Sequence, residues 1–237
     1  MTLNDDIRNS ISSIMSQEWT ITQGRTVPSE SDVTMTGKGV KLDGTVLYTD
    51  MQESSKLVDI VNQRVAGKVY QAFLNSLAKI ITYHSGQITA YDGDRIMAIF
   101  LGDNKNTNAA ECALKINYMV SKILGPMLTQ HFKTLQRTGF NVSHCVGVDT
   151  GSFLSIKAGQ RTANDLVWVG RAPNLAAKLS AIRYKTYTSF LSEETFAAMN
   201  DSSKYGGDNK DLMWTEVTYG YLGEQLKIYG SNWTWTV

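Results

Sequence analysis

The chain has 237 residues, 42% of them hydrophobic, which is enough for one large domain or for one domain with a short extension. Its 23 Lys and Arg residues against 22 Asp and Glu residues give a formal net charge of +1, so overall charge gives no reason to expect a nucleic acid or an anionic membrane as partner. Because the chain lacks both a long apolar run and a signal-peptide pattern in "MTLNDDIRNS", we expect a cytoplasmic protein that does not enter a membrane.

The first half of the chain predicts two helical segments and a strand pair. Residues 5–18 form an amphipathic helical pattern, and residues 22–40 read as a polar connector. A β-rich run at 45–48 stops at Asp50, and a long helical pattern follows from about residue 55 to 83. The strands "QITAY" and "RIMAIFLG" come next, joined by a turn at Asp92-Gly93, since Asp-Gly is a favoured turn dipeptide.

The second half predicts the elements that complete a sheet. Residues 106–124 form a second long helix, capped by the Asn or Thr at its start. Residues 141–159 read as two strands that turn at Thr150-Gly151. They are followed by a strand at 165–170 and a helix that begins near Pro173. The segment "YTSFLSEETFAAM" predicts a strand and a capped helix, and residues 213–237 predict further strands.

The order β-α-β-β-α-β, with additions, predicts an α+β fold with a ferredoxin-like split βαβ sheet. Helices would lie on one face of this sheet, and the other face would be free to meet a partner. We expect residues 1–40 to form an N-terminal helix and connector, and residues 41–237 to form the main domain.

Several common chemistries have no motif in this chain. No GxSxG or HExxH surrounds His84, His131 or His144, so we interpret these histidines as structural. Cys112 and Cys145 are not in a CxxC pair, which favours buried, reduced thiols. The phosphate-binding patterns GxxxxGK[ST] and GxGxxG are absent as well.

Two aspartates carry the chemistry that remains. Asp50 ends one strand and Asp94 begins another, and in a split βαβ sheet these strands are neighbours. Close carboxylates repel unless a cation lies between them, and their hard oxygens suit Mg²⁺ or Mn²⁺. The "MQESSK" segment after Asp50 could direct backbone amides and a helix N-terminus at phosphates. A helix cap at Asp50 and a turn residue at Asp94 remain the alternative.

Four segments, in order, resemble the class III nucleotide cyclases. "TVLYTDMQESSKL" is similar to that family's first metal motif, and "GQITAYDGDRIMAIF" to the hairpin that carries its second metal aspartate. "VGVDTGSF" resembles a strand segment ending in Thr-Gly, and "VWVGRAPNLAAKLSAI" the helix with the transition-state Asn and basic residue. Together they cover roughly residues 44–192.

The resemblance implies a two-metal displacement that closes a 3′,5′-cyclic nucleotide and releases pyrophosphate. Asp50 and Asp94 would hold two divalent cations, Mn²⁺ or Mg²⁺, with the Met51 carbonyl completing one site. Ser54 and Ser55 would lie in the phosphate-binding loop. Asn174 would orient the ribose and Lys178 would stabilise charge on the α-phosphate. In the family, these last two residues come from the second subunit, so a homodimer would form two sites.

Four positions depart from the family pattern. Glu53 stands where the phosphate loop usually has glycine, and Lys178 replaces the usual Arg, which loses the planar fork of a guanidinium. Ala90 and Val167 occupy the two positions that usually read a purine base. A purine would therefore lack both of its usual partners.

Tyr48 and Arg95 are the candidates for contacting the base. A tyrosine narrows the pocket, and an arginine can donate hydrogen bonds to the carbonyl oxygens of uracil. These features resemble the stand-alone pyrimidine cyclases of the bacterial Pycsar anti-phage defence system, in which a separate effector protein reads the cyclic product. Ordinary strand packing of Tyr48 and a surface ion pair of Arg95 remain the structural alternatives.

The leading hypothesis is a homodimeric uridylate cyclase that converts UTP to cyclic UMP. A cytidylate cyclase is the nearest alternative, because one arginine donor can also read the O2 atom of cytosine. A purine cyclase with an unusual pocket fits Ala90 and Val167 less well. A degenerate cyclase fold that binds a nucleotide without turnover is motivated by Glu53 and Lys178, whereas retention of Asp50 and Asp94 argues against it.

Overall fold

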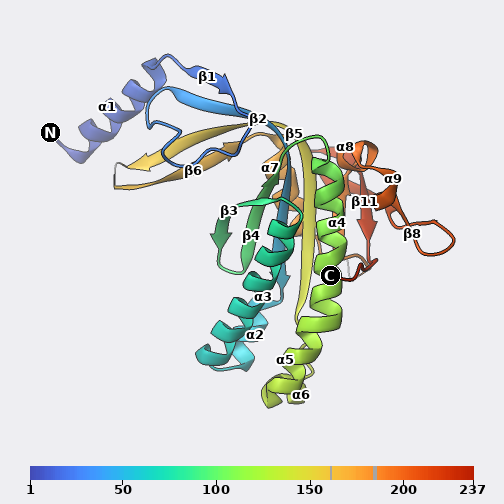
Figure 1. The fold of residues 1–237 in the computed structure, drawn as a ribbon. Helices are drawn as coiled ribbons and strands as arrows, with labels where there is room; N and C mark the ends of the chain where they lie inside the picture. The colour runs from blue at the N-terminus through green and yellow to red at the C-terminus, as the bar shows by residue number, and fades with distance from the viewer. Residues whose placement is uncertain (161, 184–185) are drawn as a thin grey trace. The chain divides into compact units, whose positions relative to one another are not determined.

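The computed structural model describes residues 1–160, 162–183 and 186–237 (Figure 1). Packing divides the chain into two compact units, one made of Met1–Asp43 with Ser152–Arg171 and the other of Gly44–Gly151 with Ala172–Val237. Residues 1–40, expected to form an extension, thus belong to a unit that also contains a later stretch of chain.

The first unit begins with the predicted N-terminal helix, α1 (Leu3–Ser16), whose capping box joins Thr2 and Asp5. The connector holds a short strand, β1 (Thr20–Gln23), which pairs in parallel with the start of β2 (Lys38–Gln52). The last part of β5 (Ser143–Gln160) pairs with β6 (Ala163–Val169), which confirms the strand predicted there.

The second unit is a sheet with the strand order β10-β11-β7-β5-β2-β4-β3. The hairpin of β3 and β4 lies beside β2, as a split βαβ sheet requires, and the predicted α+β class is confirmed. The bounds are β3 (Gln87–Asp92), β4 (Arg95–Phe100), β7 (Ser189–Ser192), β10 (Thr215–Tyr221) and β11 (Glu224–Ser231).

Two long helices cover one face of this sheet (Figure 1). They are α3 (Gln63–Tyr83) and α4 (Lys105–Tyr118), and they bury Phe73, Leu77 and Ala113 against strand residues such as Leu47 and Val146. The other helical segments here are α2 (Ser54–Ile60), the π-helix η1 (Met119–Leu124), α5 (Gly125–His131), α6 (Lys133–Thr138), α8 (Glu193–Ala198) and α9 (Asp201–Lys204), and a small ribbon joins β8 (Tyr205–Gly206) to β9 (Asp211–Leu212).

The helix α7 (Arg171–Ser180) packs on the opposite face of the sheet, so the expectation that this face is free of helices is wrong. Its Leu175 and Leu179 form a second apolar cluster with Cys145 of β5 and Phe190 of β7. Because neighbouring residues of a strand point to opposite faces, Cys145 and Val146 separate the two clusters. The helix that carries Asn174 and Lys178 therefore lies across the sheet from α3 and α4.

The N-terminal ends of the two long helices differ from the prediction. The single helix expected over 55–83 breaks at residues 61–62, where the Asn62 side chain accepts a hydrogen bond from the Val65 amide and starts α3. The predicted Asn or Thr cap of the next helix is wrong, because Asn106 and Thr107 are buried within α4. Asn106 accepts a hydrogen bond from Thr45 at 2.8 Å, so tertiary contact fixes it there.

The turn predicted at Thr150-Gly151 is also wrong, since β5 runs through both residues. The early part of this strand pairs in parallel with β7, and its later part pairs with β6. Strand partners on both sides of the dipeptide keep the backbone extended, which overrides its local preference for a turn.

The aromatic C-terminal tail packs against its own chain. Asn117 of α4 donates hydrogen bonds to the carbonyls of Asn232 and Trp233, at 3.0 and 2.9 Å, and the Trp235 amide donates to Leu114. The side chains of Trp233 and Trp235 pack on the apolar core. Among the described residues, no helix is long and apolar enough to cross a membrane.

Candidate active site

Asp50 and Asp94 end up on adjacent strands at one end of the sheet. In the antiparallel pair of β2 and β4, Asp50 lies directly opposite Arg95. Asp94 immediately precedes Arg95 and is the last residue of the turn between β3 and β4. Gly93, with φ of 60°, takes the first central position of this turn, which favours glycine. Since neighbouring strands lie about 4.8 Å apart, the two acidic residues are close in the backbone.

The Asp50 carboxylate lies between two arginine side chains. Its side chain is only 9% exposed, and its Oδ2 atom accepts a 2.6 Å hydrogen bond from Nη2 of Arg183. The Nε atom of Arg95 lies 3.7 Å from Oδ1 of the same carboxylate. A largely buried carboxylate needs such partners, because an unpaired charge is costly there.

Arg183 is a site residue that no sequence motif predicts. It lies three residues after the end of α7 and outside the four segments that resemble class III cyclases. Only the packing of α7 brings it to Asp50. A basic residue just after a helix is common on surfaces, and no local signal distinguishes this one.

The chemistry of Asp94 fits a cation. Its Oδ2 atom is buried and accepts no hydrogen bond from any described residue. A buried carboxylate oxygen without a donor is unusual in a folded protein and suits a hard metal ion. In the described part of the chain, no group of three or more metal-ligating side chains occurs, so backbone, water and substrate oxygens would supply the other ligands.

Tyr48 and Arg95 share a face of the sheet with Asp50. Tyr48 precedes Asp50 by two residues on β2 and lies opposite Met97, which follows Arg95 by two residues on β4. Burial raises the pKa of Tyr48, and the charge of Arg95 partly opposes this rise, so the phenol is neutral near pH 7. The buried Nε of Arg95 has no hydrogen-bond acceptor among the described residues.

The segment after Asp50 leaves the sheet through a left-handed residue. Met51 is buried, and Glu53 has φ of 57°, a left-handed conformation that favours glycine. The Glu53 side chain is 61% exposed and lies 3.4 Å from Lys56, so it points toward solvent. Ser54 and Ser55 open the short helix α2.

Asn174 and Lys178 lie together on the exposed side of α7, four residues apart. The opposite side of α7 packs closely on β5 at Gly147. An added Cβ atom there would lie 2.2 Å from the Ala176 carbonyl oxygen and 2.3 Å from the Ser180 amide nitrogen. Glycine therefore sets how near α7 approaches the sheet, while Asn174 and Lys178 lie exposed on the outer side of the helix.

Comparison with known proteins identifies the family. The chain is 36% identical over 233 residues to a uridylate cyclase of Rhodovulum sp. (strain MB263), covering 98% of this chain and 97% of that protein. It is 38% identical to a uridylate cyclase of Xanthomonas perforans over the full length of both. The chain belongs to the uridylate cyclase family. No protein-family profile matches it.

Solved structures support the same fold for this family member. The guanylyl cyclase Cya2 superposes with a TM-score of 0.66 at 18% identity, over 83% of this chain and 94% of that one. The resemblance to class III nucleotide cyclases and the prediction of a cyclase are thereby confirmed.

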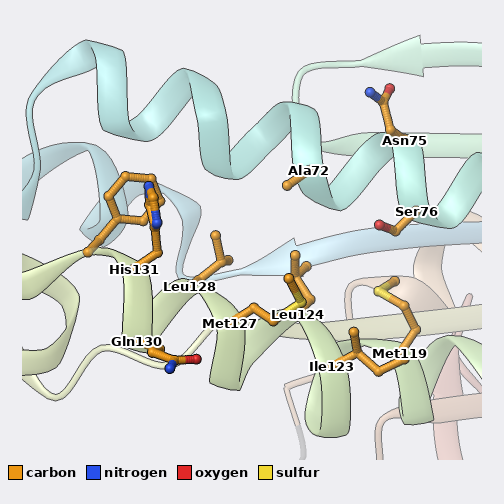
Figure 2. Close-up of a pocket in the computed structure, with 11 residues that line it drawn as sticks. Ala72, Asn75, Ser76, Met119, Ile123, Leu124, Met127, Leu128, Gln130 and His131 are labelled. Carbon is orange, nitrogen blue, oxygen red and sulfur yellow. The ribbon is translucent and has the colours of Figure 1, made fainter.

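A groove of about 620 Å³ lies outside the candidate active site, between α3 and the helices η1 and α5 (Figure 2). Ala72, Asn75 and Ser76 of α3 form one side, and residues of η1 and α5 such as Met119 and Leu128 form the other. None of the predicted site residues lines it, so its size does not identify it as the active site.

Two histidines and two cysteines outside the candidate site are buried. His84 and His144 are buried, and burial lowers their pKa values to about 4 and about 3. Cys112 and Cys145 are buried free thiols, as predicted, and burial raises the pKa of Cys145 to about 12.

Proposed function

We propose that this protein converts UTP to 3′,5′-cyclic UMP and pyrophosphate. The observation that carries the proposal is the shared face of Tyr48, Asp50 and Arg95, because it brings the two side chains proposed to read the base beside the carboxylate proposed to bind metal. The full-length relatives named uridylate cyclases support the choice of UTP.

Asp50, Asp94 and the Met51 carbonyl would hold two divalent cations, Mn²⁺ or Mg²⁺. When bound, such cations lower the pKa of the ribose 3′-hydroxyl and neutralise the phosphates in an in-line displacement. The Met51–Ser55 segment would lie along the triphosphate, and the outward side chain of Glu53 would keep its charge away from it.

Base selection would depend on the neutral Tyr48 and on the unsatisfied donor of Arg95. The Arg95 guanidinium would donate to a carbonyl oxygen of uracil, and Tyr48 would leave too little space for a purine. A site that hydrogen-bonds one base rejects another that leaves its donors unpaired.

Asn174 and Lys178 would act on the substrate held by a second copy of the chain. Their exposure on one side of α7 supports a homodimer with two sites, in which Asn174 orients the ribose and Lys178 balances charge on the α-phosphate. The resemblance to Pycsar cyclases further supports a cytoplasmic second messenger, read by a separate effector protein during phage infection.

The test is product formation from ATP, GTP, CTP and UTP, each with Mn²⁺ and with Mg²⁺. We expect cyclic UMP as the main product, and loss of at least 100-fold in rate for Asp94→Asn, since electrostatic stabilisation of this kind typically supplies about 10²–10³. Asp92→Asn is the matched control, because it changes the neighbouring turn carboxylate, to which we assign no ligand.

Each product would decide between the hypotheses. Cyclic CMP alone would select the cytidylate cyclase, and cyclic AMP or GMP would refute the roles of Tyr48 and Arg95. Nucleotide binding without any product would select the degenerate fold.

A further inference from the structure

The Asp50 carboxylate is already neutralised by this chain's own cations. Arg183 contacts Oδ2 at 2.6 Å, and Arg95 lies 3.7 Å from Oδ1, so each carboxylate oxygen faces a guanidinium. The shorter contact is a charge-assisted hydrogen bond, which is among the stronger polar interactions in proteins. A divalent cation that binds Oδ2 must therefore replace Arg183 there, and a cation that binds Oδ1 is repelled by both nearby guanidinium groups.

Arg183 is held in place by the end of α7 but remains accessible. Its Nη1 atom donates to the carbonyl oxygens of Ser180 and Ile182, at 3.0 and 3.2 Å, while Nη2 donates to Asp50. Its side chain is 46% exposed, against 9% for Asp50. The guanidinium can therefore turn away from Asp50 toward solvent or toward a bound anion.

We infer that Arg183 competes with the metal ion for Asp50, and that the substrate triphosphate relieves this competition by giving Arg183 another anionic partner. The inference rests on the proposed function. Arginine binds phosphate oxygens in the same forked geometry as a carboxylate, so the exchange of partners preserves its hydrogen bonds.

The consequence is positive coupling between metal and nucleotide. Without nucleotide, Arg183 occupies Asp50 and metal binds weakly; with nucleotide, Asp50 is released to the metal. By linkage, metal must strengthen nucleotide binding by the same factor. Arg183 is in this sense a positioning residue, which acts through Asp50 and the phosphates.

The experiment measures Mn²⁺ binding by the full chain, from the electron paramagnetic resonance signal of free Mn²⁺. It is done with and without 2′,3′-dideoxy-UTP, which lacks the hydroxyl needed for cyclisation. Arg183→Ala should bind Mn²⁺ alone about tenfold more tightly than the unmodified protein, and should lose most of the strengthening by nucleotide. Arg137→Ala, which removes an exposed arginine of α6, is the matched control and should change neither quantity.

Two further variants keep the test informative. Asp50→Asn should lose the tight Mn²⁺ site, which locates the ion. Arg183→Lys keeps one positive charge but cannot serve both the helix carbonyls and Asp50, so its Mn²⁺ affinity should rise by a smaller factor; it replaces Arg183→Ala if that variant fails to fold.

Equal or weaker Mn²⁺ binding by Arg183→Ala, in a preparation whose unmodified protein makes cyclic UMP, would overturn the competition and leave the proposed function intact. No Mn²⁺ binding and no cyclic product from the unmodified protein would overturn both. Tighter Mn²⁺ binding with unchanged nucleotide coupling would also overturn the exchange of partners.

Discussion

The substitution Gly147→Ala tests whether the spacing between α7 and β5 supports the site. The new methyl group would lie 2.2 Å from the Ala176 carbonyl oxygen and 2.3 Å from the Ser180 amide nitrogen. Both atoms belong to the backbone, so no side chain can rotate away. Comfortable contacts are about 3.5 Å or longer, so α7 must move by roughly 1 Å or more.

The movement should affect stability and activity together. Overpacking of this kind costs typically about 1–3 kcal/mol, which a urea unfolding curve can measure. Displacement of Asn174 and Lys178 by about 1 Å should lower cyclase turnover by about 10²-fold, because reacting groups lose alignment over such distances.

Gly67→Ala is the matched control. Gly67 lies within α3, and an added Cβ atom there meets nothing within 4 Å. This variant should be more stable by about 0.5–1 kcal/mol, because alanine is a better helix former, and should be fully active. A Gly147→Ala protein with unchanged unfolding midpoint and turnover would refute the reasoning about α7.

Three other perturbations follow from buried or strained groups. The depressed pKa values of His84 and His144, about 4 and about 3, mean that the unfolded chain binds protons first as the pH falls below 6.5. The free energy of unfolding should therefore keep its full value above pH 6.5. At pH 5 it should be lower by about 2 kcal/mol per histidine, as measured by urea unfolding at each pH. Glu53→Gly should raise the free energy of unfolding by up to about 1 kcal/mol, because it removes left-handed strain at φ of 57°. Removal of residues 232–237 should lower the melting temperature, because Asn117 loses two carbonyl partners.

The pH dependence and the Glu53 substitution each have a control variant, and each of the three predictions has a result that would contradict it. His144→Phe should reduce the loss of stability between pH 8 and pH 5, and an equally steep loss would contradict the assignment to that histidine. Lys56→Ala removes the Glu53 ion pair without changing the backbone, so a matching gain in stability would contradict the strain argument. An unchanged melting temperature after truncation would show that the tail does not stabilise α4.

Local sequence signals predicted the elements whose partners are near in the chain. The β3–β4 hairpin followed from Asp92-Gly93, and the start of α8 from Ser192, whose side chain accepts a hydrogen bond from the Thr195 amide as a cap. The break before α3 also had a local signal, because Asn62 is a good cap. The apolar spacing continues across this break, however, and therefore predicts one uninterrupted helix.

Long-range pairing decided the elements that were predicted wrongly. Thr150-Gly151 is a turn dipeptide by composition, yet β5 has strand partners before and after it. Asn106 and Thr107 resemble caps, but each is fixed inside α4 by a residue distant in sequence. Arg183 is similar, since its contact with Asp50 spans 133 residues and no periodicity in the chain encodes it.

One helix connects the two halves of the proposed mechanism. The C-terminal end of α7 places Arg183 on Asp50 of the same chain, whereas its exposed side carries Asn174 and Lys178, which we propose act on the substrate of a second copy. Gly147 holds this helix at a fixed distance from β5, the strand beside β2. In the proposed dimer, release of Asp50 by Arg183 would therefore act on the same rigid element that aligns the partner's substrate, so metal loading at one site should be felt at the other.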